Sequence, residues 1–306
     1  MIFRHEYRDG VWVDLEQPSQ DEIRQIAREF SISERVETEL FSPTPLSLVA
    51  GDEHAALLVL HFPTQGANDG ETKSQEVDFV VGKNFIVTAC YEVVAPLHHL
   101  KKLLEAQSLV EGHISITTDV LLEVLFAHLY TSVRDHINHV ADTLARVEKE
   151  MFDGRERMTV RSISNMSREF LHAEAALATQ EESLNHFMNV LAQLNFFDDS
   201  FKLRAERIKK ERSNVAHVVK THRAVATELR ETNIALLGAR QNEIMKTLTT
   251  INFIFLPLGL ISWIFAMRTE GMPVIDSPNA FWIVLALMFG VAMLLTTFFI
   301  KRRWLF

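Results

Sequence analysis

Two long apolar runs dominate the pattern of hydrophobic and polar positions, and both lie near the end of the chain. Residues 247–267 carry no charged side chain, and neither do residues 281–300. A helix rises about 1.5 Å per residue and the hydrocarbon core of a bilayer is about 30 Å thick, so about 20 residues cross it. Two buried helices of a soluble protein would also be apolar, but two adjacent runs are hard to cover. The pattern therefore predicts two transmembrane helices joined by an outer loop, residues 268–280.

The charged residues that flank these runs predict their orientation. Lys246 precedes the first run and the basic stretch 301–304 follows the second, whereas the loop carries one arginine and two acids. Basic flanks stay in the cytoplasm, so both termini are expected there. Trp282 and Trp304 lie near the ends of the second run, where interfacial anchors are expected.

The first part of the chain, residues 1–117, alternates short strand and helix patterns. Ser19 with Glu22 three residues later forms a capping-box pattern at a helix start. Residues 54–62 read as a buried strand, and residues 76–92 as two strands around a Gly-Lys-Asn turn. These patterns predict a small α/β cytoplasmic domain.

The pattern changes after this domain, because residues 97–256 contain no proline and glycine is rare in them. Without these helix breakers, long helices are expected. They are predicted at residues 118–152, at residues 156–195, and from residue 198 onward into the first apolar run. Thr118 or Asp119 is the expected cap of the first. The third would have about 70 residues and a length of roughly 105 Å, so it must pack against other helices.

The predicted fold class is thus an α+β membrane protein with three parts. Residues 118–246 form a long-helix bundle and stalk between the α/β domain and the two-span membrane domain, residues 247–306. Pro257 and Gly259 lie inside the first span and predict a bend or a tight helix contact.

Charge and motifs exclude several classes of protein. The formal net charge is −9, from 31 basic and 40 acidic residues, which argues against nucleic acid as a partner. The single cysteine, Cys90, excludes a disulfide within the chain and a cysteine-rich zinc site. The sequence has no P-loop, nucleophile elbow or zinc-hydrolase motif, so neither an enzyme nor an ATP-driven pump is expected.

One face of the predicted third helix carries polar residues into the first span. We call this face the stripe, and its members follow alternating spacings of three and four: Asn242, Met245, Thr249, Asn252, Leu256, Gly259, Trp263 and Ala266. Asn252 lies within the span, where an unpaired amide is costly. The spacing fits a water-filled path lined by the stripe, and equally a dry helix–helix seam with interhelical hydrogen bonds.

Several of these segments resemble the CorA family of divalent-cation transporters. The stretch "NEIMKTLTTINFIFLPLGLISWIFAM" (residues 242–267) is similar to the stalk and first span of that family. "EGMPVIDSPNAFW" with the following span and "KRRW" resembles its outer loop and tail, closest to the zinc-associated ZntB branch. "VDFVVGKNFIVTACYE" (residues 77–92) resembles its N-terminal domain.

The resemblance implies a funnel-shaped homopentamer in a bacterial inner membrane, with the first span of each copy lining a central pore. It implies passage of Zn²⁺ or Mg²⁺ without ATP, and no covalently bound cofactor. Residues that hold a resident metal are not identified by it.

The sequence departs from the family at the outer mouth of this pore. The Gly-Met-Asn motif of the family is replaced by Ala266, Met267 and Arg268, followed by Glu270 and Gly271. A ring of Arg268 side chains would repel cations, which favours an alternative function: a non-selective or tension-responsive channel, or a membrane scaffold or sensor. If Arg268 instead points away from the axis, toward headgroups or toward acids of the loop, the cation path is retained.

Three further groups have two interpretations each. His136 and His139 share a helix face and form either a zinc site or a solvated surface. Asp198 and Asp199 precede the third helix and serve either its N-terminus or a Mg²⁺ site between subunits. The basic stretch 207–212 is either a solvated face or the partner of an acidic helix in a neighbouring copy.

Overall fold

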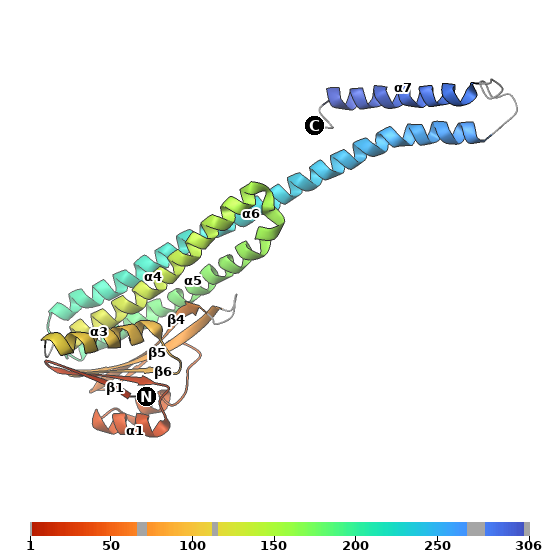
Figure 1. Ribbon diagram of the computed structural model, residues 1–306. Coiled ribbons are helices and arrows are strands. Elements are labelled where there is room, and N and C mark those ends of the chain that lie inside the picture. The colour runs from red at the N-terminus through yellow and green to blue at the C-terminus, as the bar shows by residue number, and fades with distance from the viewer. Residues whose placement is uncertain (1, 66–71, 112–115, 268–278, 303–306) are drawn as a thin grey trace. The chain divides into compact units, whose positions relative to one another are not determined.

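The computed structural model of this protein describes residues 2–65, 72–111, 116–267 and 279–302, which are coloured in Figure 1. The described chain divides into two compact units, Met1–Arg230 and Glu231–Phe306. The predicted loop residues Arg268, Glu270 and Gly271, and the predicted anchor Trp304, lie outside the described residues.

The first unit contains a six-stranded sheet with the order β1-β2-β6-β5-β4-β3. Its strands are β1 (Ile2–Tyr7), β2 (Gly10–Glu16), β3 (Leu48–Gly51), β4 (Ala55–Gln65), β5 (Thr72–Gly82) and β6 (Phe85–Cys90). The pairing of β2 with β6 is parallel and all other pairings are antiparallel. The predicted buried strand and the predicted hairpin are therefore confirmed as β4 and as β5 with β6.

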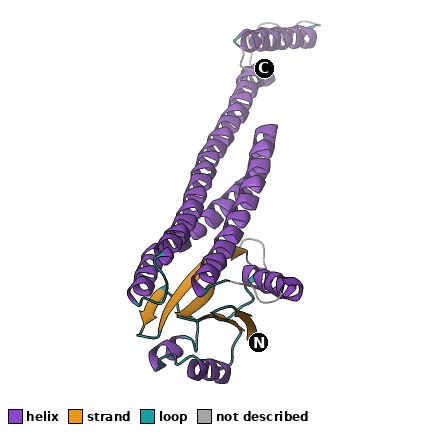
Figure 2. Ribbon diagram, turned by 90° about the vertical axis from the view of Figure 1, so that its left-hand side faces the viewer, coloured by secondary structure: helices purple, strands orange, loops and turns teal. Residues whose placement is uncertain are grey.

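Helices cover both faces of this sheet, as Figures 1 and 2 show. On one face α1 (Gln20–Glu29) and α2 (Glu34–Glu39) bury their apolar side chains against β2, β4 and β6. The predicted capping box starts α1: the Glu22 amide donates to Ser19 Oγ at 3.3 Å, and the Ser19 amide donates to Glu22 Oε2 at 2.8 Å.

The other face packs against long helices through contacts between aromatic rings. Phe79 of β5 stacks on Phe126 with ring centroids 4.8 Å apart, and Phe62 of β4 lies 5.6 Å from Tyr130. The helices that follow the sheet in the sequence are α3 (Ala95–Glu111), α4 (Thr118–Glu150), α5 (Glu156–Gln193) and α6 (Ser200–Ala266), of which α4 and α5 contact the sheet. The three long helices thus follow the prediction within a few residues at each end.

The cap of α4 differs from the prediction. Its N-cap is Thr117, and both Thr118 and Asp119 lie inside the helix. Their side chains make tertiary contacts instead. The Thr118 hydroxyl donates to the Lys83 carbonyl at 3.2 Å, and the Asp119 carboxylate accepts from Arg204 Nε at 2.7 Å. Local sequence gives no signal of either partner.

The chain reverses between α4 and α5 in a short π-helical turn, η1 (Met151–Arg155). Gly154 has φ 89° and ψ 20°, in the left-handed region that side chains disfavour. This one residue explains why the helical pattern breaks at this position.

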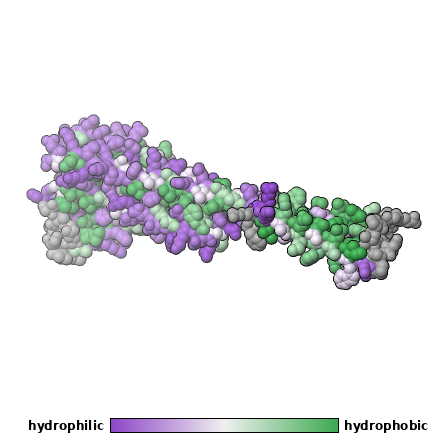
Figure 3. All heavy atoms as spheres, turned by 90° about the horizontal axis from the view of Figure 1, so that it is seen from above, coloured by the Kyte–Doolittle hydropathy of each residue, from purple (hydrophilic) through white to green (hydrophobic). Residues whose placement is uncertain are grey.

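The second unit contains the end of α6 and α7 (Ala280–Lys301), which have the length and composition of membrane spans. Pro257 lies inside α6, which continues past it. The apolar windows of α6 and α7 are 6% and 0% buried, so among the described residues no protein covers them as it would cover core helices. Figure 3 shows hydrophobic residues over the surface of this unit, in contrast to the mostly hydrophilic first unit.

Candidate functional site

Within the second unit, α7 packs on one face of α6. The rings of Phe253 and Phe299 have centroids 6.3 Å apart, and Phe299 is itself buried. Thr250 is fully buried, and its hydroxyl donates to the Lys246 carbonyl at 2.9 Å. Leu258 lines an apolar pocket of about 500 Å³ with residues of α7. The face of α6 near Thr250 and Leu258 is therefore the one that meets α7.

The stripe lies on the opposite face of α6. Residues of a helix are about 100° apart, so Asn252 is turned by about 160° from Thr250. Leu256 and Trp263 of the stripe are 71% and 72% exposed. Asn242, Met245, Thr249, Asn252 and Ala266 are also exposed, and Gly259 is partly buried. α7 thus leaves the stripe uncovered.

The stripe carries polar groups that need a partner. Within the part of the chain that the structure describes, the side-chain amides of Asn242 and Asn252 make no hydrogen bond. An amide without a partner in hydrocarbon costs several kcal/mol by order of magnitude. Gly259 has open space around it, since a Cβ there would meet no atom within 4 Å. The face therefore requires water or another protein chain rather than lipid alone.

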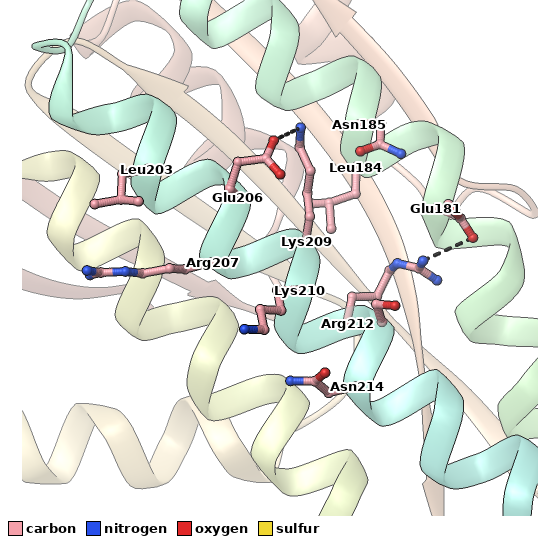
Figure 4. Close-up of a pocket in the computed structure, with 11 residues that line it drawn as sticks. Glu181, Leu184, Asn185, Leu203, Glu206, Arg207, Lys209, Lys210, Arg212 and Asn214 are labelled. Carbon is pink, nitrogen blue, oxygen red and sulfur yellow. Dashed lines mark hydrogen bonds and ion pairs between the residues drawn. The ribbon is translucent and has the colours of Figure 1, made fainter.

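The basic stretch 207–212 is solvated in part: Arg207 and Lys210 are exposed, as one interpretation expected, whereas Arg212 is buried. Figure 4 shows Arg212 directed at α5, where its Nη1 donates to the Leu177 carbonyl at 2.9 Å and its Nη2 lies 3.0 Å from Glu181 Oε2. Arg212 is only 7% exposed. Lys209 pairs with Glu206 at 2.8 Å on α6 itself. Within this stretch Arg212 therefore attaches α6 to α5.

Further ion pairs attach α6 to α4 and α5 along the first unit. Arg204 pairs with Asp119 and with Glu123 of α4 at 2.7 and 3.1 Å. The others are Arg134 of α4 with Glu211 at 2.8 Å, and Arg223 with Glu174 of α5. Sequence analysis missed these residues because their partners are 49 to 85 positions away.

The candidate metal ligands of the first unit do not come together in a single copy. Burial, reinforced by the neighbouring His139, lowers the pKa of His136, which favours its neutral form. Asp198 and Asp199 are exposed before α6, and the Asp198 carbonyl accepts the Phe201 amide at 2.9 Å. Among the described residues no group of three or more His, Cys, Asp or Glu side chains could hold a metal ion.

The outer mouth is described only as far as Met267. Ala266 is the last residue of α6 and is exposed. Met267 follows it, 68% exposed, and its amide donates to the Ile264 carbonyl at 3.3 Å. The position of Arg268 relative to the stripe stays a prediction.

Curated relatives share low but extended similarity with this chain. The cobalt/magnesium transport protein CorA of Methanocaldococcus jannaschii is 20% identical over 96% of this chain and 91% of its own length. The putative metal ion transporter YfjQ of Bacillus subtilis is 24% identical over 78% of this chain and 73% of its own.

Solved structures share the fold. The complete structure of the CorA magnesium transporter from M. jannaschii superposes with a TM-score of 0.79, at 20% identity, over 96% of this chain and 91% of that one. The ZntB cytoplasmic domain from Vibrio parahaemolyticus gives a TM-score of 0.58 at 10% identity, over 76% of this chain and 89% of that one. The profile of the family described as CorA-like Mg2+ transporter protein matches residues 8–302. This protein therefore belongs to the CorA-like transporter family.

Proposed function

We propose that this protein passes divalent cations, Zn²⁺ or Mg²⁺, through a central pore that the stripe of α6 lines in an assembly of several copies. The observation that carries the proposal is the uncovered polar face of α6 opposite α7. Two spans in one chain cannot enclose an aqueous path, so copies must surround an axis. The resemblance to the family implies five copies.

Relatives named as transporters of cobalt, magnesium or metal ions support the choice of cation transport over catalysis. Hydrated divalent ions exchange hydrogen bonds with amide and hydroxyl groups, which the stripe supplies at Asn242, Thr249 and Asn252. We place the protein in a bacterial inner membrane with both termini in the cytoplasm. Lys246 and the basic stretch 301–304 flank the two spans on the side of the termini, and basic flanks stay in the cytoplasm. Flow would be passive or coupled to an ion gradient.

Arg268 supports a second candidate function. It occupies the place of the asparagine in the family's Gly-Met-Asn motif, and a ring of arginines at a mouth favours anions or blocks cations. Under this proposal the assembly is a non-selective or tension-responsive channel, or a scaffold that no longer transports.

Flux through proteoliposomes tests both candidates. The purified chain is reconstituted, and entry of Zn²⁺, Mg²⁺ and Cl⁻ is followed with encapsulated indicator dyes. Saturable entry of a divalent cation supports the transporter. If the unmodified protein admits no cation and Arg268→Asn does, the result supports a barrier formed by the arginines. If neither the unmodified protein nor Arg268→Asn passes any ion, the result contradicts any channel.

Asn252→Leu tests the stripe itself. Removing the amide from the path should lower cation flux about tenfold, because the ion loses a polar group that replaces part of its hydration, worth about 1.4 kcal/mol. Met293→Leu on α7, an exposed apolar exchange of similar size, is the matched control and should leave flux unchanged. Equal flux in the unmodified protein, Asn252→Leu and Met293→Leu would show that Asn252 does not line the ion path.

A further inference from the structure

The connection between α2 and β3, residues 40–47, is attached to the sheet through Thr44. Prolines precede and follow Thr44 and have no amide, so Thr44 supplies the one backbone donor of this short stretch. Its amide donates to both carboxylate oxygens of Glu76 at 2.9 Å, and its hydroxyl donates to Glu76 Oε1 at 3.0 Å. Its carbonyl accepts from His61 Nε2 at 2.9 Å. Thr44 is therefore held by two titratable side chains.

These two side chains form an ion pair. His61 of β4 lies opposite Glu76 of β5, with Nε2 3.5 Å from Oε2, and the two side chains are 18% and 7% exposed. The hydrogen bond to Glu76 raises the pKa of His61. Burial acts to raise the pKa of Glu76, but the hydrogen bonds from His61 and then from Thr44 lower it. The pair is thus charged until the pH rises through the raised pKa of His61.

A second attachment holds Leu40, the residue at the end of α2. The Tyr91 hydroxyl lies 3.0 Å from the Leu40 carbonyl and 3.0 Å from Asp78 Oδ2. A hydroxyl has one proton to donate, so both contacts are full hydrogen bonds only if Asp78 carries its own proton. Asp78 is fully buried, and its Oδ1 has no hydrogen-bond partner among the described residues. An ionised Asp78 would compete with Leu40 for the proton of Tyr91.

The charges around Asp78 also favour its protonated form. Glu76 lies two positions away on β5 and therefore on the same face of the sheet. Burial, then the charge of Glu76, and further the charge of Glu39 of α2, raise the pKa of Asp78 well above its usual value. Cys90 and Tyr91, at the end of β6, stay neutral because burial raises the pKa of both. Among the described residues no lysine or arginine pairs with Glu76 or Asp78, so the histidine is the one base bonded to this group.

We call four residues the latch: His61, Glu76, Asp78 and Tyr91. We propose that the latch is pH-sensitive: it holds residues 40–47 on the sheet while His61 and Asp78 carry protons, and releases them when those protons are lost. Both groups bind a proton more tightly in the held state, so rising pH favours release. After the loss, two neighbouring carboxylates remain without a cation. The carbonyl of His61 also accepts from Gln180 Nε2 of α5 at 2.7 Å, so the latch lies where the sheet joins the long helices.

Hydrogen exchange followed by mass spectrometry tests the latch in the full chain. Exchange is measured from about pH 6 to about pH 9, a range that starts near the ordinary pKa of histidine, and is corrected for the pH dependence of intrinsic exchange. We expect the protection of the Thr44 amide to fall on the order of tenfold as the pH rises, because a tenfold difference in proton affinity changes the ratio of held to released states by up to tenfold. The amides of β2 serve as the internal reference and should keep their protection.

A double variant, His61→Gln with Asp78→Asn, removes both titrating groups and keeps side chains of similar shape. It should make the protection of Thr44 independent of pH. His54→Gln is the matched control, because His54 is exposed just before β4, and it should keep the pH profile of the unmodified protein.

Three results would overturn the proposal. The first is protection of Thr44 that does not change with pH in the unmodified protein, a result that does not depend on the folding of any variant. The second is an unchanged fall in the double variant. The third is a fall that the β2 amides share, because it would show unfolding of the whole unit rather than release of residues 40–47.

Discussion

Replacing Arg212 by methionine tests the attachment of α6 to α5 within the first unit. The Arg212 side chain donates one hydrogen bond to the Leu177 carbonyl in a buried setting. Hydrogen bonds to charged groups contribute about 1.5–3 kcal/mol. The pair with Glu181 adds less than about 1 kcal/mol, because the Glu181 side chain is 62% exposed. Methionine keeps the apolar stem, so we expect a loss of about 2 kcal/mol in the free energy of unfolding.

Hydrogen exchange followed by mass spectrometry measures this loss in the intact protein. A loss of about 2 kcal/mol lowers the protection of amides in the centre of α5 about thirtyfold, at 1.4 kcal/mol per tenfold change. Lys210→Met is the matched control: Lys210 is exposed on the same helix and has no ion pair in the described residues. It should change protection by less than about threefold.

Glu181→Gln separates the two contacts of Arg212. If the carbonyl bond dominates, this substitution lowers protection only slightly. The reasoning is refuted if Arg212→Met has no more effect than Lys210→Met, or if Glu181→Gln costs as much as Arg212→Met.

Three further substitutions test the sheet and the hairpin. Burial, and then the charge of Glu76, raises the pKa of Asp78 well above its usual value, so its contribution to stability is present at low pH and is lost as pH rises through the folded-state pKa. Asp78→Asn should therefore flatten the fall of Tm as the pH rises above the ordinary titration range of aspartate, and an unchanged pH profile of Tm would contradict this reasoning. Gly154→Ala should lower the stability by about 1–2 kcal/mol because of the left-handed backbone, seen as a lower Tm, whereas an unchanged Tm would contradict the strain. Thr88→Val removes two buried hydrogen bonds, the one that the hydroxyl donates to Asp14 at 2.5 Å and the one that it accepts from Trp12 Nε1 at 3.0 Å. It should lower the stability by about 2 kcal/mol or more in denaturant unfolding, with Thr88→Ser retaining most of it.

The elements that the sequence predicted depend on local patterns. The capping box of Ser19 and Glu22 needs only residues three apart, and the turn between β5 and β6 needs only its own three residues. The two spans follow from the length of uncharged runs. Each of these features is determined within about 20 neighbouring residues, which explains why the structure confirms them.

The features that the sequence could not predict join distant segments. The Tyr130 hydroxyl donates to Gln180 Oε1 at 3.0 Å, and Gln180 Nε2 donates to the His61 carbonyl at 2.7 Å, which joins α4, α5 and β4. A glutamine in a helical pattern reads as a surface residue, yet Gln180 is fully buried. The prediction that Thr118 or Asp119 caps α4 was wrong for the same reason, because Asp119 binds Arg204 of α6, a distant residue in the sequence. Such pairs depend on the packing of the helices and have no local signal.

The structure bears on the two interpretations of the stripe, a water-filled path and a dry helix–helix seam. A dry seam between the two spans of one chain would place Asn252 against α7, but α7 meets the face of Thr250, about 160° away. A dry seam could therefore form only between α6 helices of different copies. Such a seam would have to provide hydrogen-bond partners for Asn242, Thr249 and Asn252 of every copy. In an assembly of copies around an axis, symmetry would bring the same residue of each copy to the same level, so these groups would form rings. Rings of amides and hydroxyls either bond to each other across a narrow axis or face water along a wider one, and the Asn252→Leu flux measurement distinguishes the two.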